Sequence, residues 1–75
     1  MIKVEVRLFA YLREGRGKKK IIEVQEGTTI LSIIESLNID ENEVSIILLN
    51  GIDGSSNRQL KDGDILALFP PVGGG

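Results

Sequence analysis

The residues with the clearest chemical potential are the last eight, Leu68-Phe69-Pro70-Pro71-Val72-Gly73-Gly74-Gly75. An apolar run that predicts a strand gives way to two prolines, which cannot donate to a sheet ladder, so regular pairing should stop there. Three residues without side chains follow, and they place the α-carboxylate of Gly75 at the tip of a thin arm. Because ordering three glycines inside a domain would cost backbone entropy, we expect this arm to be offered to a partner protein. A frayed terminus is the alternative interpretation.

The composition limits what else the chain can do. Its 75 residues, 41% of them hydrophobic, predict one small domain. There is no histidine and no cysteine, so the commonest general base, nucleophilic thiols and the usual zinc ligands are missing. Any chemistry must therefore use carboxylates, lysines, hydroxyls or the chain terminus itself.

Location and partners are also constrained. No tract resembles a signal peptide or reaches the roughly 20 apolar residues that span a bilayer, so we expect a cytoplasmic protein without a membrane partner. The net charge of −2 argues against a nucleic-acid partner bound through phosphate contacts.

Three charged clusters are candidate sites. Five of the nine basic residues fall between Arg13 and Lys20, which predicts either a docking patch for an acidic partner or, preferably, a solvated hairpin loop that discourages edge pairing. Asp62 and Asp64 resemble a paired-carboxylate acid/base device, but turn chemistry explains them better. Residues 40–43 make a poor metal site because the acids lie on different faces, and no metal is expected.

The apolar periodicity predicts the fold. Alternation over residues 2–8 and the apolar run 21–24 indicate two antiparallel strands, and Thr28 or Thr29 can cap a helix that continues to Leu37. Strands follow at 44–49, around Ile52 and at 65–69, the last in the middle of the sheet. We predict an α+β domain of the ubiquitin-like β-grasp type at residues 1–69, followed by a reactive tail at 70–75. The domain would have a mixed sheet of about five strands wrapped on one main helix, and the first and last strands of the sheet would be parallel.

Nearly the whole chain resembles the sulfur-carrier proteins of the ubiquitin-like superfamily, most closely the small subunit of molybdopterin synthase. The resemblance is carried by residues 9–14, 26–29, 47–51, 60–64 and 68–72, and Phe-Pro-Pro-Val before a terminal Gly-Gly is its most specific part. One residue departs from the pattern: Gly73 stands where the family usually has a side chain, often alanine.

The resemblance implies a carrier rather than an enzyme. It implies that Gly75 is adenylated by an ATP-dependent adenylyltransferase similar to ubiquitin-activating enzymes, then receives sulfur from a donor as a thiocarboxylate. The large subunit of molybdopterin synthase would take that sulfur into the molybdopterin dithiolene, with Gly73 and Gly74 inside the partner's active site. No cofactor would be bound, because ATP is used by the partner. The chemistry is consistent, since a terminal carboxylate is a poor electrophile until it acquires a leaving group.

Docking should come from the base of the tail. We expect Phe69, Pro70, Pro71 and Val72 to contact the partners, together with the spare apolar face of the strands at 44–49 and 65–69. Three alternatives stay open: a carrier for thiamine, transfer-RNA or tungsten-cofactor pathways, a ubiquitin-like protein modifier, and a β-grasp interaction module that transfers nothing.

Overall fold

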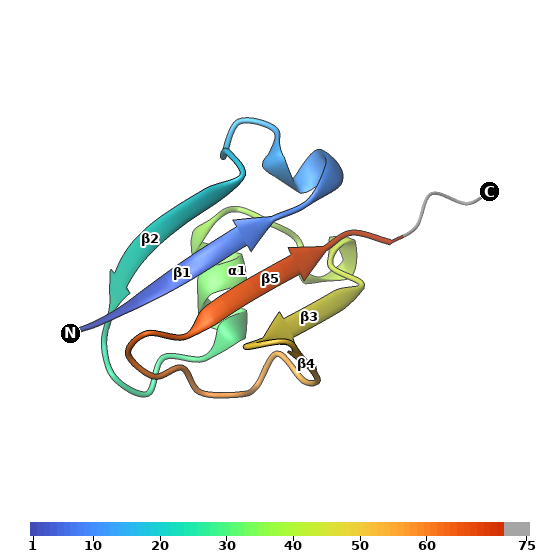
Figure 1. Cartoon of the computed structure of the whole chain (residues 1–75). Coiled ribbons are helices and arrows are strands. Elements are labelled where there is room, and N and C mark those ends of the chain that lie inside the picture. Colours follow the sequence, from blue (N-terminus) through green and yellow to red (C-terminus); the bar gives the residue numbers. More distant parts are fainter. Residues whose placement is uncertain (72–75) are drawn as a thin grey trace.

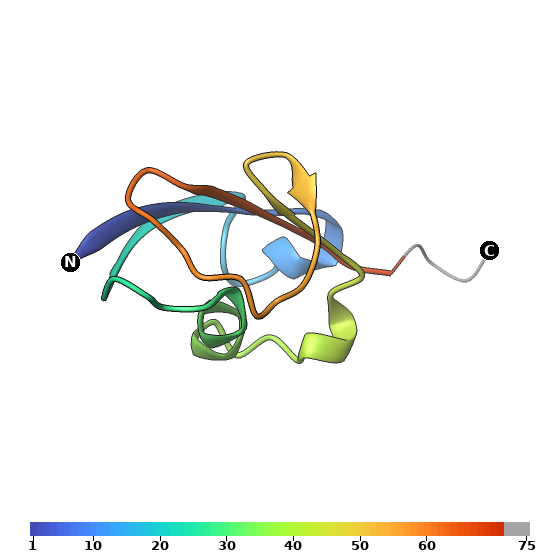
Figure 2. The ribbon, with the colours of Figure 1, turned by 90° about the horizontal axis from the view of Figure 1, so that it is seen from below.

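The computed structural model describes residues 1–71, which form a mixed five-stranded sheet with one α-helix (Figure 1). In chain order the elements are β1 (Ile2–Leu8), the 3-10 helix η1 (Ala10–Arg13), β2 (Lys19–Val24), α1 (Ile30–Ser36), the 3-10 helix η2 (Glu41–Glu43), β3 (Ile46–Leu49), β4 (Ile52–Asp53) and β5 (Ile65–Phe69). The strand order is β2-β1-β5-β3-β4. The helix lies against one face of the sheet, which leaves the other face uncovered (Figure 2).

The two central strands confirm the predicted pairing. β1 and β5 run parallel with Leu8 beside Leu68, whereas β1 with β2, and β5 with β3, are antiparallel. A parallel pair needs a long crossover, and the chain supplies one between β1 and β5 that includes α1. This is the β-grasp arrangement that the sequence predicts, with the last strand at the centre of the sheet.

The helix begins and ends where the sequence indicates. Thr29 is the N-cap, and its hydroxyl accepts a hydrogen bond from the backbone N–H of Ser32 at 3.3 Å. Beyond the last turn, Asn38 adopts the left-handed backbone with φ of 59°, a conformation that asparagine tolerates better than most residues. These two signals fix a two-turn helix over the middle of the sheet.

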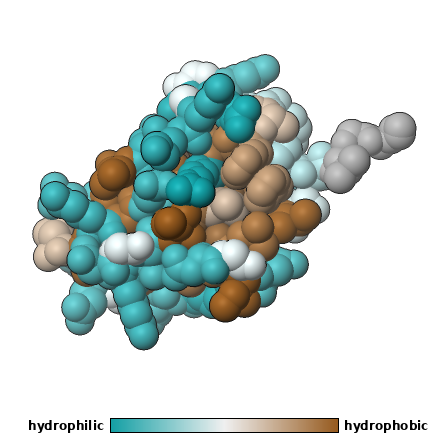
Figure 3. All heavy atoms as spheres, in the orientation of Figure 1, coloured by the Kyte–Doolittle hydropathy of each residue, from teal (hydrophilic) through white to brown (hydrophobic). Residues whose placement is uncertain are grey.

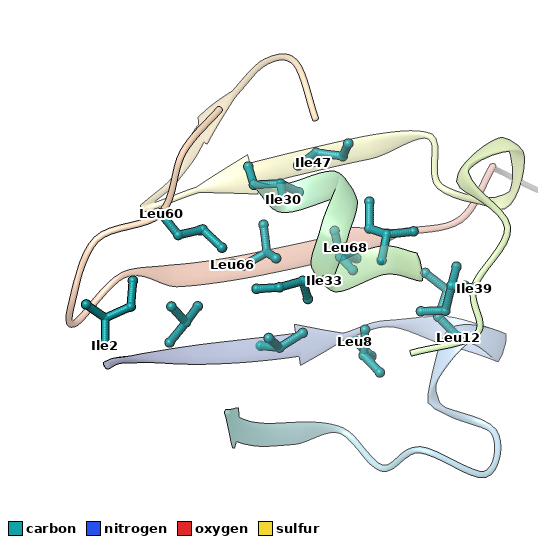
Figure 4. Close-up of a cluster of buried hydrophobic side chains, with 13 residues drawn as sticks. Ile2, Leu8, Leu12, Ile30, Ile33, Ile39, Ile47, Leu60, Leu66 and Leu68 are labelled. Atoms are coloured by element: carbon teal, nitrogen blue, oxygen red, sulfur yellow. The ribbon is translucent and has the colours of Figure 1, made fainter. Parts of the chain in front are cut away.

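The core is aliphatic throughout. Leu8, Leu66 and Leu68 of the sheet face the buried side of α1, whose isoleucines lie above them (Figure 4). None of the residues 1–71 buries a polar or charged side chain, so hydrophobic burial holds the two layers together. Leu12 and Ile39 close the core at the end where β1 and β5 finish.

Two predicted boundaries are corrected. β2 begins at Lys19 rather than Ile21, because the ladder with β1 continues to the pair Arg7 and Lys19. β3 begins at Ile46 rather than at residue 44, because the Val44 backbone N–H is used in closing η2, where it donates to Glu41 at 3.1 Å. No helix within residues 1–71 is long and apolar enough to cross a bilayer.

Candidate functional site: the base of the tail and the outer sheet face

The chain leaves the sheet from a firmly anchored position. Phe69 ends β5, and its backbone carbonyl accepts a hydrogen bond from the Ser45 N–H at 2.7 Å. On the other side of β5, the Phe9 N–H donates to the Leu68 carbonyl at 3.2 Å. The last strand residues are therefore held from both neighbours, so the residues that follow start from a fixed point.

An aromatic pair sits at this point. The rings of Phe9 and Phe69 are stacked with centroids 4.2 Å apart and an interplanar angle of 10°. The guanidinium carbon of Arg13 lies 5.2 Å from the Phe9 ring centroid, within range of a cation–π contact, and its Nε donates to the Leu8 carbonyl at 2.7 Å. The side chain of Phe69, predicted to bind partners, is thus pre-positioned and half-buried.

The prolines differ in exposure. Pro70 is buried, which continues the alternation of Leu66 and Leu68, and Pro71 is exposed. A buried Pro70 offers little surface to a partner, so the predicted contact falls mainly on its neighbours in the described part of the chain. Val72, Gly73, Gly74 and Gly75, for which we predicted a partner contact, tail insertion and the reacting carboxylate, lie outside the described residues.

The sheet face opposite α1 carries an apolar area beside the base of the tail. We call it the outer-face patch and define it by the side chains of Ile46, Leu48, Ile65, Ala67 and Phe69. Ile46 is 39% exposed and lies next to Phe69 in the ladder, and Leu48 lies next to Ala67. The view from this side shows hydrophobic side chains gathered over β3 and β5 (Figure 3). The sequence correctly predicted that these strands are apolar on both faces.

The acidic turn at residues 61–64 is structural. The Asp62 carboxylate accepts the Lys3 N–H at 2.8 Å, and the Asp64 carboxylate accepts the Lys61 N–H at 2.7 Å. Asp64 also accepts the Asn50 side-chain amide at 2.9 Å. Because both carboxylates hold loop backbone in place, the structure supports the turn interpretation. Within residues 1–71 no group of three potential metal ligands comes together.

One residue of the basic cluster, Arg16, has a structural role. Arg16 donates to the carbonyls of Leu37, Leu12 and Asn38 at 3.0, 3.2 and 3.1 Å, which ties the loop to the C-terminal end of α1. Sequence analysis missed this role and the comparable one of Arg58, whose guanidinium donates to backbone carbonyls of three residues. No pattern in the sequence indicates either role, because loop packing creates these hydrogen bonds.

Known proteins resemble this one along its whole length. The ThiS family profile matches residues 6–75. Small archaeal modifier protein 3 of Haloferax volcanii is 33% identical over 93 residues, an alignment that covers 99% of this chain and 100% of that protein.

Two solved structures extend the comparison. A Pyrococcus furiosus protein assigned as molybdopterin converting factor subunit 1 superposes with a TM-score of 0.79 at 32% identity, covering 96% of this chain and 100% of its own. In a Helicobacter pylori complex of subunits 1 and 2 of molybdopterin-converting factor, the matching chain gives a TM-score of 0.66 at 30% identity, covering 99% and 100%.

The fold and these likenesses together define the class. A mixed five-stranded β-grasp sheet with one helix is the architecture of the small ubiquitin-like sulfur carriers and modifiers. The chain belongs to the ThiS family. The family consists of small carrier or modifier proteins.

Proposed function

We propose that this protein is a sulfur carrier whose reacting group is the carboxylate of Gly75. The observation that carries the proposal is that the ThiS family match continues through residue 75. The backbone of Phe69, six residues earlier, is anchored in the sheet, so the C-terminal residues start from a fixed point. Asp62 and Asp64, the paired carboxylates weighed as an acid/base device, hold backbone instead. The terminus is then the group available for transfer.

The proposed reaction begins with activation. A carboxylate oxygen of Gly75 attacks the α-phosphorus of ATP, so that a mixed anhydride with AMP forms and pyrophosphate leaves. Sulfide (HS−) supplied by a donor then attacks the glycyl carbonyl, AMP departs with the electron pair of the broken C–O bond, the sulfur loses its proton to solvent, and a thiocarboxylate remains. Both steps take place in a partner adenylyltransferase of the ubiquitin-activating type, and the tail must be slender to bring the carbonyl within about 3–3.5 Å of the nucleophile.

The proposed acceptor is a pterin precursor that becomes the molybdopterin dithiolene. Support comes from the Helicobacter pylori structure, a complex of subunits 1 and 2 of molybdopterin-converting factor that contains the matching chain. By analogy, a large subunit would dock on the outer-face patch and Phe69, and receive the tail. The apolar centre and the charged residues of β1 beside it fit the core and rim of a protein interface.

Adenylation is tested by ATP–pyrophosphate exchange with a candidate adenylyltransferase. Wild type should support exchange, whereas a variant lacking Gly74 and Gly75 should not. A second variant, with one tryptophan added after Gly75, keeps every native residue but moves the carboxylate, and it should also fail. Equal exchange with all three proteins would refute terminal activation.

A second candidate function is protein modification. It is favoured by the 33% identity to a small archaeal modifier protein. In that case the activated Gly75 would form an amide with lysines of other proteins. Lys61 is the last tryptic site of the chain, so trypsin would leave residues 62–75 attached to a modified lysine. Finding this remnant on peptides of other proteins would support conjugation, and its absence together with a thiocarboxylate would support sulfur transfer alone.

Two alternatives remain: a β-grasp module that only binds a partner, and a sulfur carrier for thiamine, transfer-RNA or tungsten-cofactor pathways. The variant lacking Gly74 and Gly75 distinguishes the binding module from a carrier, because a module that only binds should retain its function. Supplying sulfur-loaded protein to each candidate acceptor separates the pathways.

A further inference from the structure

The edge of the sheet at β2 is a surface that the proposed function does not use. β2 stands at one end of the strand order and pairs only with β1 (Figure 1). The opposite edge, β4, has only two residues, so β2 is the edge with length to pair. Ile21 at its centre is 64% exposed. An edge strand presents unpaired N–H and C=O groups to any strand that can align with it.

The ladder shows which backbone groups point outward. The Leu8 N–H donates to the Lys18 carbonyl at 2.9 Å, and hydrogen-bonded pairs alternate along an antiparallel ladder. Lys20 and Ile22 therefore direct their backbone groups toward β1. The intervening residues Lys19, Ile21 and Glu23 direct theirs away from it, toward solvent.

The side chains of these three residues form a symmetric series. They lie on the sheet face opposite α1 and are exposed. Read along the strand they are cationic, apolar and anionic, spaced evenly about Ile21. An antiparallel copy presents the series in reverse order, so each lysine meets a glutamate. The edge is complementary to itself.

We propose that β2 is a homodimer interface in which two copies pair antiparallel with Ile21 opposite Ile21. Lys19 of each copy then lies opposite Glu23 of the other, and the two sheets join into one. Moving the centre of the pairing by one residue in either direction removes the Lys19–Glu23 match. Centring the pairing on residue 20 sets Lys20 opposite Lys20, and centring it on residue 22 sets Ile21 opposite Glu23. Opposite charges stabilise directly facing cross-strand positions, and like charges destabilise them.

Lys19 and Glu23 form no ion pair within the described part of one copy, so both can pair with a second copy. Among residues 1–71 the single ion pair joins Arg7 and Glu5 on β1. Lys19 lies beside Arg7 in the ladder, and a facing carboxylate would relieve that like-charge contact. The two Lys19 residues of the dimer would be four residues apart along the strand, about 13 Å at about 3.3 Å per residue. This exceeds the screening length of about 10 Å at 0.1 M salt.

The interface leaves the base of the tail accessible. β1 separates β2 from β5, so pairing of the β2 edges covers neither Phe69 nor the outer-face patch. Because the contact is one strand long, we expect a reversible dimer of modest affinity that weakens as salt rises. Lys19 would then select one pairing partner, whereas the sequence favoured a role for the basic cluster at residues 13–20 in preventing edge pairing.

Sedimentation equilibrium of the purified full chain tests the proposal. Wild type at low salt should show a mass that rises from 8.2 kDa toward twice that value with concentration. Lys19→Glu and Glu23→Lys each place like charges at both facing sites, and each should weaken dimerisation about tenfold or more. Lys18→Glu is the matched control, because it makes the same charge change at a residue that faces Val24 in the pairing, and it should have little effect.

Charge exchange makes the test specific for the register. The double variant Lys19→Glu/Glu23→Lys should regain the wild-type dissociation constant within about threefold. An equimolar mixture of the two single variants should form a heterodimer, since both facing sites then hold opposite charges. A chain that remains monomeric to about 1 mM overturns the proposal. A dimer whose dissociation constant changes equally with Lys18→Glu and Lys19→Glu also overturns it. Far-UV circular dichroism checks that each variant is folded.

Discussion

The ring of Phe69 at the end of β5 is stacked on the ring of Phe9, 4.2 Å between centroids, although 60 residues of sequence separate them. The parallel pairing of β1 with β5 brings both residues to the same end of the sheet. The contact links the last residue of β5, directly before the tail, to the segment that follows the first strand. It therefore contributes to the fixed direction in which the chain leaves the domain.

This contact should be measurable as a coupling energy. Replacing either phenylalanine with leucine removes the aromatic pair but keeps apolar bulk, and stacked pairs contribute about 0.5–1.5 kcal/mol beyond area burial. A double-mutant cycle in urea should give a coupling within that range. The pair Phe9 and Ile46 serves as a control without stacking, and equal coupling for both pairs would show that the ring contact adds nothing.

Partner binding should depend on the same residue. Phe69→Ala should weaken binding of an adenylyltransferase or large subunit about tenfold or more, because a pre-positioned aromatic at an apolar patch is a typical hot spot. Lys19→Ala, at the charged side of the sheet, should change affinity much less. Isothermal titration calorimetry measures both, and the opposite order of effects would move the interface away from β5.

Arg16 should stabilise the domain although it lies in an exposed loop. Arg16→Ala removes donors to the carbonyls of Leu37 and Asn38 at the end of α1 and of Leu12 in η1, and it should lower the free energy of unfolding by about 1–3 kcal/mol. Lys18→Ala in the same loop should stay within about 0.5 kcal/mol. Chemical denaturation compares the two. Similar losses for both variants would assign Arg16 to the solvated cluster instead.

Two asparagines in left-handed backbone should respond oppositely to glycine. Asn38→Gly should leave stability unchanged or raise it by up to about 1 kcal/mol, since glycine adopts positive φ without steric cost. Asn50→Gly should lower it by about 1–2 kcal/mol, because the Asn50 side chain donates to Asp64 and accepts from the Ile65 N–H. Thermal and urea unfolding of the pair provide the measurement. Equal changes would mean that backbone conformation alone governs both turns.

Much of the fold could be predicted because local signals agree with tertiary placement. The alternation of Ile2, Val4 and Val6, the Thr29 cap and the central apolar run of β5 each point to the same sheet and helix. Strand ends were less predictable, because the ladder with β1, rather than local apolar pattern, decides that Lys19 belongs to β2.

The sequence indicates which residues belong to the site, but not how they are arranged. The apolar second faces of β3 and β5 are visible in the sequence, whereas the stacking of Phe9 on Phe69 depends on a parallel pairing across the whole chain. The burial of Pro70 likewise follows from its register after Leu68. The hydrogen bonds of Arg16 and Arg58 to distant carbonyls have no sequence pattern, since loop packing creates them.

The mass of the C-terminal peptide tests the central claim most directly. The full chain is incubated with ATP, a candidate adenylyltransferase and a sulfur donor, then cleaved and weighed. We predict that one sulfur replaces one oxygen at Gly75, only when ATP is present and not in the variant extended by tryptophan. An unchanged C-terminal peptide, under conditions in which the same enzyme loads a carrier already shown to accept sulfur, would contradict the account.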